Sequence, residues 1–265
     1  MDITRFKHIA EKHKLPASRL SFNPHQDPKD PMLSKLLGIP YWESGVAYPK
    51  DKNGKLLGFL CQIDCSRLTW MESVSFPGAG LLQFFVSKED AWGLDFNDQF
   101  CSGLYHVQYW PEPDIAKLDR NVFDLYSDDW DAPVFKPLGI DIGHAQEELC
   151  GLTDEYYSEC FYGSLNDIDD ETLDEIFEAV DNAGSKIGGY AYFTQSDPRS
   201  YNSLRYNEAL GLDLLERPKW ILLLQLDSDH EEMMWGDCGV ANWFIQEKDL
   251  KSLRFDRVLY NWDCC

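Results

Sequence analysis

The sequence predicts an α+β fold that is dominated by β-structure and built from two similar halves. Three observations lead to this prediction. Short runs of aromatic and aliphatic residues, bounded by turn-forming residues, occur throughout the chain and are typical of β-strands. Four of these runs recur in the same order in the second half. The segment between the halves differs in composition, being strongly acidic and partly helical in its periodicity.

The repeat consists of four pairs of matching blocks. The pairs are SKLLGIPYW (34–42) with SKIGGYAYF (185–193), FLCQIDC (59–65) with LLLQLDS (222–228), FPGAGLLQFFVSKED (76–90) with WGDCGVANWFIQEKD (235–249), and VQYW (107–110) with VLYNW (258–262). Four collinear blocks predict an internal duplication, with roll-like repeats at about 31–111 and 184–263. Because a strand pair cannot bury its apolar face alone, we expect the two copies to pack together about a pseudo-twofold axis.

The remaining elements are predicted as helices. Phe6, Ile9 and Ala10 share one helical face, which predicts an N-terminal helix at about 3–14, stopped by Pro16. The run GHAQEELCGLTDEYYSECFYG (143–163) is also predicted to be helical. The run DDETLDEIFEAV (169–180) predicts a helix that Asp169 or Asp170 can cap. Its predicted apolar face consists of Leu173, Ile176, Phe177 and Val180.

The charge is concentrated in one part of the chain. Lys and Arg number 24 against 46 Asp and Glu, which gives a net charge of −22. Residues 112–183 contain 21 acidic and 3 basic residues and are predicted to form an acidic, partly helical insertion between the repeats. Such a charge disfavours nucleic acid and anionic membranes. It is compatible with a basic protein partner, and equally with two helices whose acidic faces are simply solvated.

Composition also bears on the compartment. The sequence has no apolar run of the ~18 residues that a membrane span needs, and no apolar core of a signal peptide near its start. We therefore expect a cytoplasmic protein whose eight cysteines are free thiols. Cys61 and Cys65 have no clear second doublet, so structural zinc is not expected, nor is a cofactor.

Residues present in both repeats are expected to serve the fold. Gln62 and Gln225 lie in the middle of predicted strands, where an amide can satisfy backbone groups. Four acidic residues follow or end predicted strands at matching positions of the two repeats, Asp64 with Asp227 and Asp90 with Asp249. An Asp at the end of a strand commonly accepts a hydrogen bond from its own backbone in a turn.

Residues found in only one repeat are the better functional candidates, and four of them form the candidate site: Asp229, His230, Asp237 and Cys238. Cys238 is a possible nucleophile if His230 lies near it, and the carboxylates are possible ligands of Mg²⁺, Ca²⁺ or Mn²⁺. The alternative, which we favour, is an exposed acidic turn that leads into a strand. Sequence signatures of the common nucleotide-binding, metalloprotease and serine hydrolase families are absent.

The repeated blocks also carry a resemblance to a known family. The segments SKLLGIPYW, GFLCQID, GAGLLQFF, KIGGYAYFTQ, LLLQLDSD and MMWGDCGVANWFI resemble those of the YwqG-like family, a bacterial domain family of unknown function. The resemblance covers nearly the whole chain as one domain, 1–265, and implies a β-dominated α+β roll. It implies no activity, substrate, cofactor or catalytic residue.

These observations favour a non-catalytic binding protein that uses its acidic surface toward a basic protein partner. The alternative is an enzyme, with or without a metal ion, whose cleft lies between the two halves around Asp227 to Cys238.

Overall fold

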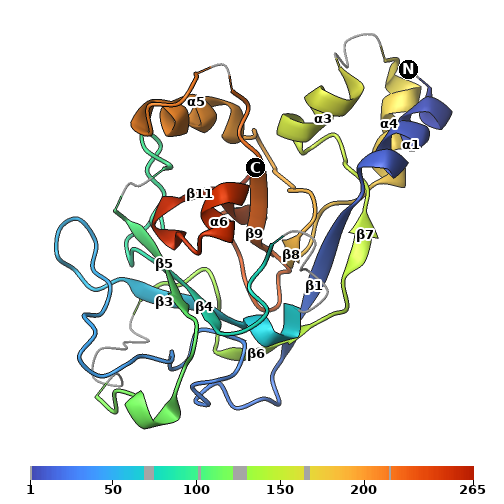
Figure 1. Ribbon diagram of the computed structural model, residues 1–265. Helices are drawn as coiled ribbons and strands as arrows, with labels where there is room; N and C mark the ends of the chain where they lie inside the picture. Colours follow the sequence, from blue (N-terminus) through green and yellow to red (C-terminus); the bar gives the residue numbers. More distant parts are fainter. Residues whose placement is uncertain (1, 69–74, 101–102, 122–129, 164–167, 215) are drawn as a thin grey trace.

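The protein is a nearly closed, barrel-like antiparallel sheet with a few helices around it (Figure 1). The computed structural model describes residues 2–68, 75–100, 103–121, 130–163, 168–214 and 216–265. The strands follow the order β11-β10-β9-β8-β1-β6-β2-β3-β4-β5, and β7 pairs with β1. Near the two ends of this order, Phe100 forms a β-bridge with Leu259, and the Tyr105 hydroxyl donates to the Val258 carbonyl.

The predicted strand runs all form strands. The four strands of the first half are β2 (Lys35–Leu36), β3 (Gly58–Asp64), β4 (Leu81–Val86) and β5 (Tyr105–Trp110). Those of the second half are β8 (Lys186–Gly188), β9 (Trp220–Asp227), β10 (Val240–Gln246) and β11 (Val258–Asp263). Strands β4 and β10 are buried along their whole length, which explains their continuous apolar sequences.

Two further strands, which the sequence analysis did not identify, join the halves at the centre of the sheet. Strand β1 (Leu15–Asn23) pairs with β8 of the second half, and β6 (Leu138–Ile142) pairs with β2 of the first. The two also pair with each other, with Ser21 opposite Asp141. Each half therefore completes its sheet with a strand that lies far away in sequence.

The mid-strand glutamines make the same contact in both halves. Gln62 and Gln225 are fully buried. The Oε1 atom of Gln62 accepts a hydrogen bond from the backbone N–H of Tyr41 at 3.0 Å, and that of Gln225 accepts from Tyr192 at 2.9 Å. The prediction that these amides satisfy backbone groups is confirmed.

The strand-closing acids differ in their contacts. Asp64 accepts from the backbone N–H of Ser66, the local turn that the sequence predicts. Asp227 instead accepts from the N–H of Gly184, which lies far away in sequence. Asp249 is buried and accepts from the Tyr206 hydroxyl, whereas Asp90 is exposed.

Helices α1 (Ile3–Ala10), α3 (Glu155–Tyr162) and α4 (Asp170–Ala179) lie together beside β1 and β7 (Figure 1). A 3-10 turn, Glu11–His13, extends α1. Phe6 and Ala10 of α1 pack with Leu152 and with Ile176 of α4 in a small apolar cluster. Asp169 caps α4 by accepting from the Thr172 N–H. The described part of the chain also contains helices α5 (Arg199–Ala209) and α6 (Glu247–Lys251), and 3-10 turns at Ile115–Lys117 and Phe255–Arg257.

Two helix predictions need correction. Residues 143–163 are helical only in α3, because Gln146–Glu148 forms strand β7, from which Glu148 reaches buried Lys186. Phe177 was predicted on the apolar face of α4, yet it is 52% exposed while Ile176 is fully buried. Successive helical residues point about 100° apart, and the small α1–α4 contact covers only the narrow stripe around Ile176.

Part of the acidic segment 112–183 belongs to the sheet. It contributes β6 and β7 to the sheet, and α3 and α4 to the helical cluster. Residues 122–129 and 164–167 of the segment lie outside the described residues, as does Cys101.

The interior is a continuous apolar core lined by both halves. Phe84 of β4 and Trp243 of β10 meet there with ring centroids 5.4 Å apart. Within the described part of the chain, no helix is both long and apolar enough to span a bilayer.

Candidate functional site

The four candidate residues lie in one exposed loop between β9 and β10. His230 and Cys238 both adopt left-handed backbone conformations, with φ of 63° and 58°. This turning of the chain brings the Cys238 Sγ to 3.7 Å from the His230 Nε2. The Asp229 carboxylate forms hydrogen bonds within its own turn. Its Oδ1 accepts from the backbone N–H of Glu232 at 2.7 Å and from that of Met233 at 3.1 Å.

The local electrostatics do not activate the thiol. Desolvation raises the pKa of Cys238, and the Asp237 carboxylate, 3.8 Å from Sγ, raises it further. An activated cysteine needs a lowered pKa, because the thiolate is the nucleophile. The loop thus brings a cysteine and a histidine together, while the neighbouring Asp237 carboxylate opposes formation of the thiolate.

In the described part of the chain, no three His, Cys, Asp or Glu side chains are grouped so that they could hold a metal ion. The seven cysteines described there are free thiols, of which Cys61, Cys65 and Cys150 are buried. Burial raises the pKa of Cys65 to about 12, so this thiol stays protonated and packs as an apolar side chain.

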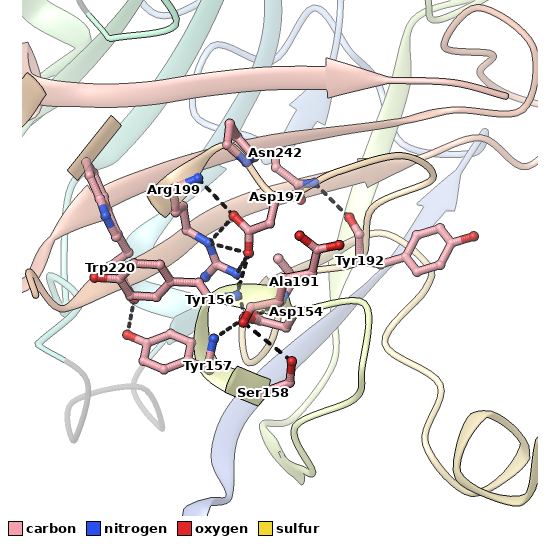
Figure 2. Close-up of polar contacts among 12 residues, drawn as sticks. Asp154, Tyr156, Tyr157, Ser158, Ala191, Tyr192, Asp197, Arg199, Trp220 and Asn242 are labelled. Carbon is pink, nitrogen blue, oxygen red and sulfur yellow. Dashed lines mark hydrogen bonds and ion pairs between the residues drawn. The ribbon is translucent and has the colours of Figure 1, made fainter. Parts of the chain in front are cut away.

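A second group of charged side chains, those of Asp154, Asp197 and Arg199, is buried in the interior (Figure 2). The guanidinium of Arg199, at the start of α5, lies 2.5 Å from Asp154, the N-cap of α3, and 2.5 Å from Asp197. Asp154 also accepts from the backbone N–H of Ala191 at 2.8 Å. Figure 2 shows these side chains converging from α3 and from the segment that leads into α5.

This cluster ties α3 to the second half. Burial raises the pKa of Asp154, an effect that Arg199 opposes, whereas burial of Arg199 is outweighed by the two carboxylates, which raise its pKa. The guanidinium also lies over four aromatic rings, the nearest being Phe244 at 4.7 Å. Arg199 is 1% exposed, so its ion pairs link α3 to the start of α5 in the interior of the protein. Sequence reasoning missed this cluster, although Asp154 stands in a helix-capping position.

A hollow of about 380 Å³ opens elsewhere, beside β6. Three carboxylates line it, those of Asp30, Asp64 and Asp141, together with the guanidinium of Arg67. Its walls come from three segments that are distant in sequence, so no local motif could have revealed it. We call it the Asp141 hollow.

Two lysines occupy matching strand positions, and both are fully buried. Lys186 forms an ion pair with Glu148 at 2.7 Å, and burial lowers its pKa to about 8. Lys35 donates to the Asp30 carbonyl at 2.5 Å, and burial lowers its pKa to about 7. The sequence could have indicated that these two lysines occupy equivalent positions, because both repeats begin with Ser-Lys.

Comparison with protein families gives one match. A model described as a domain of unknown function, DUF1963, matches residues 34–264, which include both sets of sheet strands. No curated protein matches the chain. Because the family model covers most of the sequence, the chain belongs to the DUF1963 family of domains of unknown function.

Proposed function

We propose that this protein is a non-catalytic binding protein of the cytoplasm, whose helix α4 docks a basic protein partner. The support is the charge of this helix. Helix α4 has no basic residue. Five of its acidic residues are exposed, namely Asp170, Glu171, Asp174, Glu175 and Glu178. Clustered charge of one sign steers a partner of the opposite sign and disfavours acidic competitors.

One observation distinguishes this helix from a merely solvated acidic face. Phe177 is 52% exposed, with Asp174 one turn before it and Glu178 beside it. Exposed aromatic side chains within a charged rim are typical of the residues that anchor protein interfaces. Phe177 is therefore the observation that carries the proposal.

The neighbouring helix limits where a basic partner would bind. Helix α1 packs against α4 and exposes Arg5 and Lys7. These cations weaken the negative potential on the near side of α4. The partner is therefore expected on the side of α4 that faces away from α1.

The test is a variant that carries Asp174→Asn, Glu175→Gln and Glu178→Gln. These sites lie beyond the first turn, so the helix dipole and the Asp169 cap stay intact. A charge-matched control carries Asp90→Asn, Glu208→Gln and Glu231→Gln, which are all exposed and lie outside α4. We expect a basic protein captured from the native cell to be lost with the α4 variant and kept with the control, mainly through slower association at low salt.

A single-residue pair sharpens this test. Phe177→Ala should weaken the same association, whereas Leu204→Ala, which removes a side chain of equal exposure on α5 (51%), should not. Equal capture by the wild type and both α4 variants would disprove docking on this helix.

A second candidate function is an enzyme with a site around Asp227 to Cys238, which the 3.7 Å contact between His230 and Cys238 favours. A catalytic pair would make Cys238 react rapidly with iodoacetamide at pH 7, and His230→Ala would slow the reaction. The raised pKa of Cys238 leads us to expect slow alkylation that His230→Ala leaves unchanged. Mass spectrometry can compare the rate with that of Cys160, another exposed thiol.

We also propose that the chain arose by internal duplication, as a YwqG-like member of its family. Two observations support the duplication. Both halves contain the glutamine contact to a tyrosine N–H described above. Both central hairpins shift register at matching positions, between Phe59 and Cys61 in β3 and between Leu222 and Leu224 in β9.

A further inference from the structure

Two cysteines of the second half stand where the matching positions of the first half have other residues. The turn that leads into β10 contains Cys238, and the matching turn before β4 contains Ala79. Cys265 lies two residues beyond the end of β11, and Glu112 lies equally far beyond the end of the matching strand β5. Features that the two halves share therefore do not account for either thiol.

The turn at Cys238 holds its backbone in an unusual conformation. The φ angle of Cys238 is 58°, in the left-handed region that residues other than glycine rarely adopt. The turn is closed by the N–H of Gly239, which donates to the Trp235 carbonyl at 2.8 Å, and the Cys238 side chain is exposed. Backbone strain of this kind clusters at functional sites.

The segment after β11 runs directly beside this turn. The backbone N–H of Cys265 donates to the Asp237 carbonyl at 3.3 Å. Standard bond lengths then place the Cα atoms of Cys265 and Cys238 at most about 7.5 Å apart. Disulfides usually join Cα atoms that are about 4.4–6.8 Å apart, so a displacement of less than about 1 Å brings this pair into range. Both side chains are exposed, so both thiols can meet a reagent in solution.

Of the two cysteines after β11, Cys265 rather than Cys264 is the partner available to Cys238. Cys264 is only partly exposed, and its Sγ covers Gly236, where an added Cβ would lie 2.6 Å from the sulfur. The charge of the Cys265 thiolate acts on Cys238, whose pKa is raised by desolvation first, then by Asp237 and then by Cys265. The sulfurs of Cys238 and Cys265 therefore lie close enough to interact.

We propose that Cys238 and Cys265 form a reversible disulfide in exchange with glutathione disulfide or another small disulfide, and that the pair is a redox-sensitive modification site. The reaction has two steps. The Cys265 thiol loses its proton to water, and the thiolate attacks one sulfur of glutathione disulfide, which releases one glutathione thiolate. The Cys238 thiolate, formed in the same way, then attacks the Cys265 sulfur of the mixed disulfide and releases the second. The two cysteines are thereby oxidised, and glutathione disulfide is reduced to two molecules of glutathione, which take up the two protons.

The electrostatics of the loop set this order of steps. Desolvation and the Asp237 carboxylate raise the pKa of Cys238, so little of its reactive thiolate is present near neutral pH. Cys238 therefore reacts slowly with reagents in solution, yet it can attack Cys265 efficiently because the two are held side by side. The bond is expected to open again easily, since exposed disulfides and those at the limit of the usual geometry are readily reduced. Reversible disulfides of this kind are the ones expected in a reducing compartment.

The bond fastens the loop between β9 and β10 to the segment after β11, and it consumes the thiol that lies 3.7 Å from His230. It is therefore expected to abolish alkylation of Cys238. Neither cysteine lies on α4, so the proposal is independent of partner docking on that helix.

The test is oxidation of the reduced full chain with glutathione disulfide, followed by blocking of the remaining thiols with N-ethylmaleimide and digestion with trypsin without reductant. Cleavage after Lys219, Lys248 and Arg257 separates the two cysteines into peptides 220–248 and 258–265. We expect mass spectrometry to find these peptides joined, with a single maleimide on the remaining thiol, and separated again by excess reduced glutathione. Glutathione adducts without joined peptides, or joined peptides that persist in excess reduced glutathione, would overturn the proposal.

Serine variants identify the pair. Cys238→Ser and Cys265→Ser should each abolish the joined peptide, because each removes one of the two sulfurs. The controls are Cys264→Ser, which removes the neighbouring thiol, and Cys160→Ser, which removes an exposed thiol on α3, and both should leave its yield unchanged. A joined peptide that survives in Cys265→Ser and is lost in Cys264→Ser would overturn the assignment of Cys265.

Discussion

At the scale of single residues, the two buried lysines are the clearest source of pH dependence. Lys186 is compensated by Glu148, whereas the contact of Lys35 is to the neutral carbonyl of Asp30. An ammonium buried without a carboxylate is costly, and the protein lowers the cost by releasing the proton. Burial therefore lowers the pKa of Lys35 to about 7.

This shift predicts that stability rises with pH just above neutrality. Below pH 7 the lysine is charged in both states, so the folded state carries the full cost of burial. Above pH 7 the folded protein loses the proton while the unfolded chain, with its lysine near the ordinary value of about 10.4, keeps it. The free energy of unfolding should therefore increase by up to about 1.4 kcal/mol per pH unit through this group.

Urea unfolding at intervals between pH 7 and 8.5 measures this effect. The buried cysteines oppose this rise toward the upper end of the window, because their thiols stay protonated in the folded state while unfolded thiols ionise near pH 8.5, so the lysine is isolated by comparison with a variant. Lys35→Met keeps the apolar stem and removes the titration, so its stability should rise less steeply than that of the wild type. Parallel pH profiles for the two proteins would show that Lys35 is not neutral in the folded state.

At the scale of secondary-structure elements, sequence pattern predicted the strands that have dense apolar composition. The long strands β3, β4, β9 and β10 are buried almost throughout. Burial of both faces requires a nearly continuous run of apolar residues, and such a run is visible in the sequence. Strand β6 has five residues and includes Gly139 and Asp141, and β1 contains Pro16 and Arg19. Such strands are specified by their neighbours in the sheet more than by local propensity.

The helical elements show the same limit. The pattern of α4 limited its cap to Asp169 or Asp170, of which Asp169 is the cap, and placed Ile176 on its apolar face. It could not show that the contact with α1 is too narrow to cover Phe177. Strand β7 was mistaken for helix because its three residues are specified by long-range pairing, with Glu148 opposite Leu15.

The candidate sites could likewise be predicted only where their residues lie close together in the sequence. The loop with His230 and Cys238 is local, so sequence reasoning could place the two side chains in one candidate site. The Arg199 cluster and the Asp141 hollow join residues far apart in the chain. Their members are common residue types without a local motif, so only the fold brings them together.

At the scale of the whole molecule, the exchange of strands β1 and β6 joins the two halves. Strand β1 precedes the first half in sequence but pairs with β8 of the second, and β6 precedes the second half but pairs with β2 of the first. The Arg199–Asp154 ion pair adds a buried link between α3 and the second half. Neither half can therefore complete its own sheet.

This arrangement predicts that the protein folds as one cooperative unit. Urea unfolding followed by far-ultraviolet circular dichroism and by tryptophan fluorescence should give coincident transitions. Fragments 1–111 and 112–265, expressed separately, should each be unfolded, because each has lost the partner of its central strand and exposes part of the shared core. Mixing them should restore the native spectrum, since the exchanged strands then find their partners. A folded, cooperatively melting fragment on its own would mean that the exchange of strands is dispensable and that one half holds enough core to be stable.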